Sequence, residues 1–231
     1  MKNLTRNQLV WIDQPAWALI EDRTWDVEAQ AILAHWRTQR LPLVVCRQRV
    51  ETLADQVCLG LPAPQQWSRR RLALSVNLSA IIGCGVFPSL LQVARTNHWA
   101  QAAFDLSEAL VAQGVQAQVY GSHGWQLLTG LPYLHATSDL DLSLRVSNFE
   151  AASQVAQLLE AAPLPMRMDG EIVFSGDQAI AWRELHKLLA GQTTQVMVKD
   201  LYRVWLAASE EVRTFGRSTP WTAPDAALAL S

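Results

Sequence analysis

Residues 119–142 read VYGSHGWQLLTGLPYLHATSDLDL, and this stretch decides most of the fold. Residues 115–119 alternate apolar and polar side chains, and the alternation resumes at the end of the stretch. A period of two is typical of β-strands that bury one face. The stretch therefore predicts one strand that ends at Gly121-Ser122 and a second strand that starts at Asp139.

The connection between these strands has the pattern of a short helix. Residues 123–129 can form one turn or two, packed through Trp125 and Leu128. Gly130 follows the expected end of this helix, and Pro132 prevents its continuation.

Residues beyond the stretch predict further helices and strands. Thr96 or Asn97 is expected to cap a helix that Gly114 closes, and Ser147 or Asn148 to cap a helix that reaches about Ala162. Later expected elements are a strand at 166–175 and a helix at 183–189, and the segment 179–182 and the run 194–198 that ends at Lys199 complete the pattern.

The N-terminal half predicts a small α+β module. Its expected elements are a helix at 27–39 and apolar runs at 41–46 and 72–82. A membrane helix at 72–94 is the alternative for the last run, but polar and glycine interruptions favour a buried strand that leads into a domain-joining loop. We expect a module at 1–88, a catalytic domain at 89–213 and a flexible tail at 214–231.

Asp139 and Asp141 lie two residues apart on the second strand, so their carboxylates project from one face. Two Mg²⁺ ions can share such carboxylates and stabilise the attacking and leaving oxygens of a phosphoryl transfer. Mg²⁺ commonly takes one or two carboxylates and completes its ligands with water and phosphate oxygens. We therefore expect Asp139 and Asp141 to bind Mg²⁺ and the substrate to contain phosphate.

Gly121 and Ser122 fit the same chemistry. Glycine lets the backbone approach an anion closely, and N–H groups at the start of the following helix point toward it. The Ser122 hydroxyl adds a further donor. We expect both residues to bind substrate phosphates beside the metal.

Each motif alone has a simpler structural interpretation. A Gly-Ser pair is usually only a turn, and Asp-Leu-Asp is more often a solvated strand face. Their joint arrangement, with a further acidic strand downstream, favours catalysis. On that strand Asp169 and Glu171 are candidates for a third carboxylate that ligates the metal or accepts a proton. Asp169 is preferred, and the alternative for either residue is a solvated hairpin face around Gly170.

Basic residues are candidates to bind phosphate, because arginine suits bidentate phosphate contacts. The main candidates are Arg47, Arg49, Arg183 and Lys199, and further ones are Arg69, Arg70 and Arg71. The five histidines show no metal spacing and no nucleophilic triad, and His123 is the only one near the expected site. P-loop and dinucleotide fingerprints are absent.

Composition limits the classes of function. The chain has 231 residues, 50% of them hydrophobic, and a formal net charge of −2. This supports a globular core without a bulk attraction to nucleic acid or to anionic membranes. The three cysteines are widely spaced and the N-terminus has no signal-peptide pattern. We expect a cytoplasmic protein with no nucleic-acid or membrane partner.

The residues of the central stretch resemble the nucleotidyltransferase superfamily, whose signature is a Gly-Gly or Gly-Ser turn followed by an Asp-x-Asp or Asp-x-Glu strand. The longer string from Gly121 to Asp141 is more specifically similar to the malonate decarboxylase holo-acyl-carrier-protein synthases, the phosphoribosyl-dephospho-CoA transferases. Downstream DGEIVF and AWREL, and LPLVVCRQR, LGLP and RRRL in the N-terminal half, are similar to the same family. Sixteen residues separate Ser122 from Asp139, a longer gap than is usual in the superfamily, which the narrower family shares.

This resemblance implies an α+β chain whose second domain is nucleotidyltransferase-like, with a mixed sheet flanked by helices. It implies Mg²⁺-dependent transfer of a phosphoribosyl-dephospho-CoA group from a triphosphoribosyl-dephospho-CoA donor. The acceptor is a serine of the apo acyl-carrier protein of malonate decarboxylase, and diphosphate is released. Asp169 or Glu171 would help to deprotonate that serine.

Two other functions are kept as alternatives. One is a nucleotidyltransferase that acts on another protein, an RNA or a small molecule. The other is a non-catalytic nucleotide-binding module on the same fold, because folds outlive their chemistry.

Overall fold

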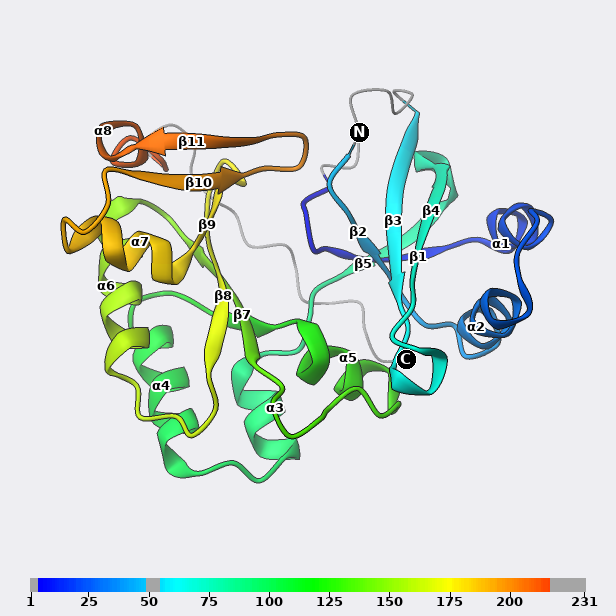
Figure 1. Cartoon of the computed structure of the whole chain (residues 1–231), viewed down its shortest axis with the longest axis horizontal. Helices are drawn as coiled ribbons and strands as arrows, with labels where there is room; N and C mark the ends of the chain where they lie inside the picture. Colours follow the sequence, from blue (N-terminus) through cyan, green and yellow to red (C-terminus); the bar gives the residue numbers. More distant parts are fainter. Residues whose placement is uncertain (1–3, 49–54, 217–231) are drawn as a thin grey trace.

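The computed structural model describes residues 4–48 and 55–216, which form two β-sheets with helices around them (Figure 1). Every strand of the five-stranded sheet comes from residues 9–85, and every strand of the six-stranded sheet from residues 117–208. We refer to residues 4–86 as the N-terminal part and to residues 87–216 as the C-terminal part. The chain has an α+β fold, as predicted.

The N-terminal part is an antiparallel sheet with strand order β4-β3-β2-β1-β5. Its strands are β1 (Leu9–Ile12), β2 (Leu43–Val45), β3 (Gln56–Pro62), β4 (Arg71–Asn77) and β5 (Ile81–Gly85). Helices α1 (Gln14–Glu21) and α2 (Val27–Thr38) lie beside the sheet, on the side away from the C-terminal part (Figure 1). Two 3₁₀ turns complete it, η1 (Gln65–Trp67) and η2 (Leu78–Ala80).

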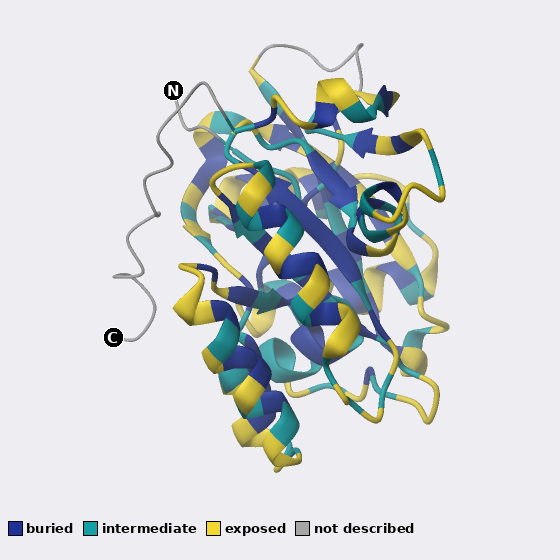
Figure 2. Ribbon diagram, turned by 90° about the vertical axis from the view of Figure 1, so that its left-hand side faces the viewer, coloured by how far each residue is buried: buried dark blue, intermediate teal, exposed yellow. Residues whose placement is uncertain are grey.

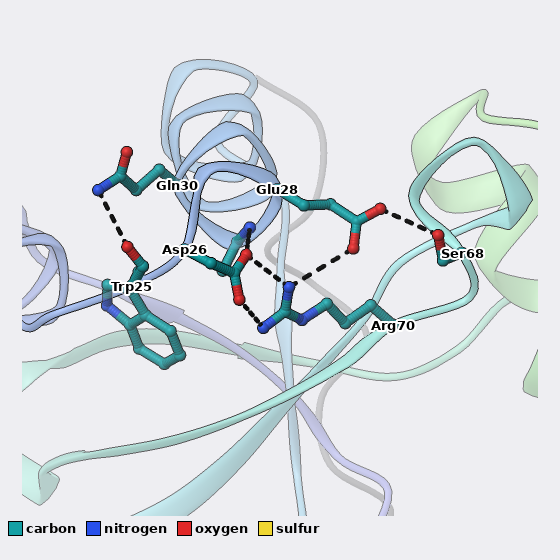
Figure 3. Close-up of polar contacts among 7 residues, drawn as sticks. Trp25, Asp26, Glu28, Gln30, Ser68 and Arg70 are labelled. Carbon is teal, nitrogen blue, oxygen red and sulfur yellow. Dashed lines mark hydrogen bonds and ion pairs between the residues drawn. The ribbon is translucent and has the colours of Figure 1, made fainter.

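The turn between β3 and β4 is fixed to the start of α2 by a polar cluster (Figure 3). Asp26 caps α2 by accepting the Ala29 N–H at 3.0 Å. The Arg70 guanidinium binds the Asp26 carboxylate, with Nη1 at 2.6 Å from Oδ1, and it also contacts Glu28. Ser68 donates to Glu28 at 3.0 Å, so the hairpin and the helix are held as one unit.

The C-terminal part is built on a mixed sheet with strand order β11-β10-β9-β8-β7-β6, in which β7 and β8 are parallel and the other pairs antiparallel. Its strands are β6 (Ala117–Val119), β7 (Leu140–Val146), β8 (Met168–Phe174), β9 (Ala179–Ala181), β10 (Gln195–Lys199) and β11 (Val204–Ala208). Its helices are α3 (Leu90–Thr96), α4 (Gln101–Ala112), α5 (Gly121–Thr129), α6 (Phe149–Ala161), α7 (Trp182–Leu189) and α8 (Ser209–Val212). The mixed sheet flanked by helices is therefore confirmed.

The two faces of this sheet have different roles. Leu140, Leu142, Leu144 and Val146 of β7 are buried in the core on the face that α6 and α7 cover. The polar side chains of β7 project from the opposite face, and this face is directed toward the N-terminal part (Figure 1). Figure 2 shows the same pattern, with buried strands at the centre and helices exposed along their outer faces. The strict alternation read from the sequence is therefore confirmed.

Helix α5 and the segment after it join the two parts. Trp125 and Tyr133 are buried in the hydrophobic core of the N-terminal part, and their rings stack at 6.3 Å between centroids. The Tyr133 hydroxyl donates to the carbonyl of Pro62 in β3 at 2.6 Å. Gln126 shapes the segment, because its Oε1 accepts the N–H groups of Tyr133 and Leu134. The connection therefore packs the N-terminal part against the turn between β6 and α5.

Several local predictions were wrong. The run 72–94 is divided between β4, η2, β5 and α3, because Leu78–Ala80 form a 3₁₀ turn that periodicity does not reveal. Asn97 ends α3, and α4 starts at Gln101. Helix α5 begins two residues earlier than expected, at Gly121. The strand expected at 166–175 is present as β8, in which Gly170 pairs with Leu142 of β7, so the alternative of a hairpin around Gly170 does not hold.

The described residues contain no helix that is long and apolar enough to cross a membrane. Of the predicted tail, Phe215 is buried and its ring contacts that of Phe174 edge-on. Residues 217–231 lie outside the described part of the chain.

Candidate active site

The turn between β6 and α5 is built around Gly121. Its φ of +59° lies in the left-handed region, and a Cβ placed on it would lie 1.8 Å from Oδ2 of Asp141. Only glycine fits there, because the Asp141 carboxylate lies directly against the first residue of the helix. The Tyr120 N–H donates to the Asp141 carbonyl at 3.0 Å and fixes the turn to β7.

The start of α5 has no side-chain cap from the described residues. Its first N–H groups therefore have the polarity that binds anions. Ser122 lies at the first turn and is half-buried. Gly124, one turn into the helix, packs so close to β6 that an added Cβ would lie 2.0 Å from the Val119 carbonyl. Two glycines thus set the helix start against the two strands.

Three aspartates gather beside this turn. Asp139 lies one residue before β7 and Asp141 lies on it, so both side chains leave the same face. Asp169 of β8 is the direct neighbour of Asp141 in the parallel register. The exposed guanidinium of Arg167 lies 3.8 Å from Asp139 and 3.9 Å from Asp169. We call Asp139, Asp141 and Asp169 the aspartate cluster.

Asp141 is the member of the aspartate cluster whose negative charge is least compensated. Burial, followed by the negative charges of Asp169 and Asp139, raises the pKa of its carboxyl to about 6. No ion pair reaches Asp141 from any residue in the described ranges 4–48 and 55–216. Its negative charge is therefore poorly compensated by this chain alone, and a bound cation would stabilise it.

Glu171 has a different environment from Asp169. It is 7% exposed, and its carboxylate binds Arg6 and Lys199, with Lys199 Nζ at 3.5 Å. Asp169 accepts the N–H of Gly170 at 2.8 Å and its side chain is 42% exposed. Of the two candidates, Asp169 therefore lies beside Asp141 with an accessible carboxylate, whereas Glu171 is held in ion pairs.

The predicted cations are spread over several places. Arg183 lies close to the aspartate cluster, because its Nη2 donates at 3.0 Å to the carbonyl of Met168, the residue before Asp169. Lys199 reaches Glu171, as described. Arg47 is exposed in the N-terminal part, and Arg49 lies outside the described residues. Arg70 is already bound to Asp26 and Glu28 in the N-terminal part.

His123 follows Ser122 but does not serve the cluster. It is buried and its ring meets that of Trp99 edge-on at 5.1 Å. Burial lowers the pKa of its imidazole. We interpret it as a packing residue behind the helix start.

Three residues at the site were not among the predicted site residues. Arg6 comes from the N-terminal part, 165 positions from its partner Glu171. Tyr120 lies between the charged groups: burial, then Glu171 and Asp141, raise the pKa of its phenol, and the positive charge of Arg6 opposes them. Arg167 shares the face of Asp169 in the sequence pattern, and this was the one available hint.

A fully protein-built metal site is not present, because no group of three His, Cys, Asp or Glu side chains in the described residues converges to hold an ion. The aspartate cluster, in which Asp141 has no ion-pair partner among the described residues, still fits Mg²⁺, which keeps water and phosphate oxygens among its ligands. The donor set of the aspartate cluster is therefore chemically suited to a hard divalent cation.

A helix start fixed by glycine beside carboxylates on the next strand of a mixed sheet is suited to one class of enzyme, the transferases that act on phosphate esters. Comparison with known proteins narrows it. Residues 87–210 match the phosphoribosyl-dephospho-CoA transferase MdcG C-terminal domain, and residues 5–87 match the MdcG N-terminal domain. The chain belongs to the phosphoribosyl-dephospho-CoA transferase family.

Curated relatives agree with this assignment. A phosphoribosyl-dephospho-CoA transferase of Bradyrhizobium diazoefficiens is 33% identical, covering 87% of this chain and 88% of its own. A phosphoribosyl-dephospho-CoA transferase of Xanthomonas euvesicatoria is 36% identical, and the match covers 84% of this chain and 90% of the relative. A phosphoribosyl-dephospho-CoA transferase of Pseudomonas putida is 32% identical, and the match covers 75% of this chain and 83% of the relative. No solved structure gives a significant match.

Proposed function

We propose that this chain transfers a phosphoribosyl-dephospho-CoA group from triphosphoribosyl-dephospho-CoA to a serine of the apo acyl-carrier protein of malonate decarboxylase. The family membership supports the transferred group. The observation that carries the proposal is the position of the Asp141 carboxylate, in contact with Gly121 at the start of α5 and next to Asp169. That arrangement presents carboxylates and backbone N–H groups to one phosphate-bearing ligand.

Mg²⁺ is the proposed cofactor, and Asp139 and Asp141 would hold it. A bound Mg²⁺ would neutralise charge on the phosphate oxygens of the donor and lower the repulsion within the aspartate cluster. The raised pKa of Asp141 supports this role, because it reflects a buried carboxylate between two like charges.

The remaining steps belong to this chain's own groups. The N–H groups at the start of α5 and the Ser122 hydroxyl bind phosphate oxygens. The carrier serine oxygen attacks the phosphorus that bears the ribosyl group, the bond from that phosphorus to the diphosphate breaks, and diphosphate leaves. Asp169 accepts the serine proton, because it is the accessible carboxylate next to Asp141. Positioning and charge neutralisation supply most of the rate, as in other phosphoryl transfers.

The proposed partners are the donor and the carrier protein. A net charge of −2 gives the chain no bulk attraction to nucleic acid, so we propose no nucleic-acid partner. Any attraction for phosphate is local to the site. We propose a cytoplasmic location, because the odd number and wide spacing of the three cysteines indicate no disulfide framework.

The test mixes the protein with Mg²⁺, triphosphoribosyl-dephospho-CoA and apo carrier, and follows the intact mass of the carrier. Wild type is expected to add one phosphoribosyl-dephospho-CoA group, and Asp139→Ala is expected to add none. Asp105→Ala is the matched control, because Asp105 is an exposed aspartate on α4. A carrier of unchanged mass with wild type and with both variants would contradict the proposal. Modification with a plain nucleoside triphosphate instead of the donor would point to a nucleotidyltransferase of another kind.

A further inference from the structure

Glu171 links the two parts of the chain on the same face of the sheet as the aspartate cluster. It lies two residues after Asp169 on β8, so both side chains leave the same face. Its carboxylate is bound by Arg6, which precedes β1 in the N-terminal part, and by Lys199 at the end of β10. The ion-pair group therefore includes one cation from each part.

The group contains more positive than negative charge. A buried carboxylate must be paired, and one cation is enough to neutralise it. Arg6 and Lys199 bring two positive charges to one carboxylate, which leaves one in excess. A guanidinium has five donors, yet the described residues provide Arg6 with one partner, Glu171, and its Nε is buried without a hydrogen bond. Donors and charge are therefore available for an anion.

The group also lies close to the proposed reaction centre. The phenol of Tyr120, at the residue before Gly121, is acted on by the charges of Glu171, Asp141 and Arg6 together. A polyphosphate bound at the start of α5 would meet the repulsion of the aspartate cluster. The positive charge beside Glu171, the next residue of β8 on the same face, would offset this repulsion.

We propose that Arg6 and Lys199, positioned by Glu171, form a subsite that binds the polyphosphate of the donor. The N-terminal part thereby supplies a substrate-binding residue to the active site. The inference rests on the proposed function for the identity of the donor, but the subsite itself is defined as a site for inorganic polyphosphate.

The direct probe is inorganic triphosphate, titrated in the presence of Mg²⁺ by isothermal calorimetry. Arg6→Gln and Lys199→Gln are each expected to weaken its binding about 10-fold or more, since each variant loses a charge-assisted hydrogen bond to a phosphate oxygen. Arg6→Lys keeps the charge and is expected to restore part of the affinity. The matched control is Arg70→Gln, which removes an arginine whose guanidinium is bound to the carboxylates of Asp26 and Glu28 (Figure 3).

Steady-state kinetics separate binding from chemistry. The Arg6 and Lys199 variants are expected to raise KM for the donor by a similar factor with a smaller change in kcat. Glu171→Gln separates positioning from proton transfer. A positioning carboxylate predicts a raised KM and an unchanged acid limb in the pH profile of kcat, whereas a proton acceptor predicts loss of that limb.

The outcomes separate this inference from the proposed function. A folded wild type that binds triphosphate through Arg6 but modifies no carrier contradicts the function and supports the subsite. A wild type that modifies the carrier, with unchanged affinity and KM in both Gln variants, overturns the subsite. If Arg6→Gln does not fold, Lys199→Gln and Arg6→Lys decide the question, because Lys199 is 38% exposed and Arg6→Lys keeps the ion pair.

Discussion

The replacement Gly121→Ala tests the geometry on which the site depends. An alanine Cβ would lie 1.8 Å from Oδ2 and 2.7 Å from Cγ of Asp141, well inside the 3.0 Å that real contacts respect. The carboxylate or the helix start must therefore move by about 1 Å or more, and a displacement of that size at a reacting centre costs roughly 100-fold in rate. The φ of +59° adds about 1–2 kcal/mol of backbone strain for alanine.

Gly130→Ala is the matched control, at the other end of the same helix. Its φ is +70°, so it imposes the same strain, but nothing lies within 4 Å of the added Cβ. Urea unfolding is expected to show a loss of about 1 kcal/mol for Gly130→Ala and a larger loss for Gly121→Ala. Carrier modification should be retained in Gly130→Ala and fall about 100-fold in Gly121→Ala. Equal activity in the two folded variants would refute the claim that Gly121 sets the position of Asp141.

Three further predictions follow from the polar contacts. Asp141→Asn is expected to abolish carrier modification without lowering the thermal midpoint of the Mg²⁺-free protein, because the amide removes a charge that burial disfavours; a large drop in the midpoint would contradict this. The pKa of Asp26 is lowered to about 2, chiefly by Arg70, so the stability from this pair should be present above about pH 4 and lost as pH falls toward 2. Thermal midpoints between pH 5 and pH 2 should fall less steeply in Arg70→Gln, and parallel curves would refute the assignment. Tyr133→Phe loses the hydrogen bond to Pro62 and should lower the free energy of unfolding by about 1 kcal/mol, whereas an unchanged value would show that this bond contributes nothing.

The sequence was most informative where one face of an element is buried. The leucines of β7 alternate strictly, so the strand and the shared face of Asp139 and Asp141 could be predicted. Asn148 was one of two expected caps of α6, and its side chain does accept the Ala151 N–H. Such features depend on neighbours within a few residues of one another.

Features that depend on close packing were misjudged. The start of α5 at Gly121 follows from the approach of Asp141, a contact from another strand. The turn at Leu78–Ala80 consists of residues that read as a continuation of a strand. Ser89 and Gln92 form the capping box of α3 at the end of the run 72–94, where the sequence predicts a domain-joining loop.

The choice between Asp169 and Glu171 needed the register of two strands. Both residues share a face, so periodicity treats them alike. The parallel pairing of β7 and β8 puts Asp169 beside Asp141, and the folded chain brings Arg6 and Lys199 to Glu171. Arg6 could not be predicted at all, because no local pattern links it to a residue 165 positions away.

The most direct test of the central claim is a single time course in which diphosphate release and the intact mass of the apo carrier are measured together. The account predicts one diphosphate for each carrier serine that gains a phosphoribosyl-dephospho-CoA group, with both signals absent in Asp139→Ala. Diphosphate release without a mass gain, or a mass gain that persists in Asp139→Ala, would contradict the claim that the aspartate cluster and the Gly121 turn carry out this transfer.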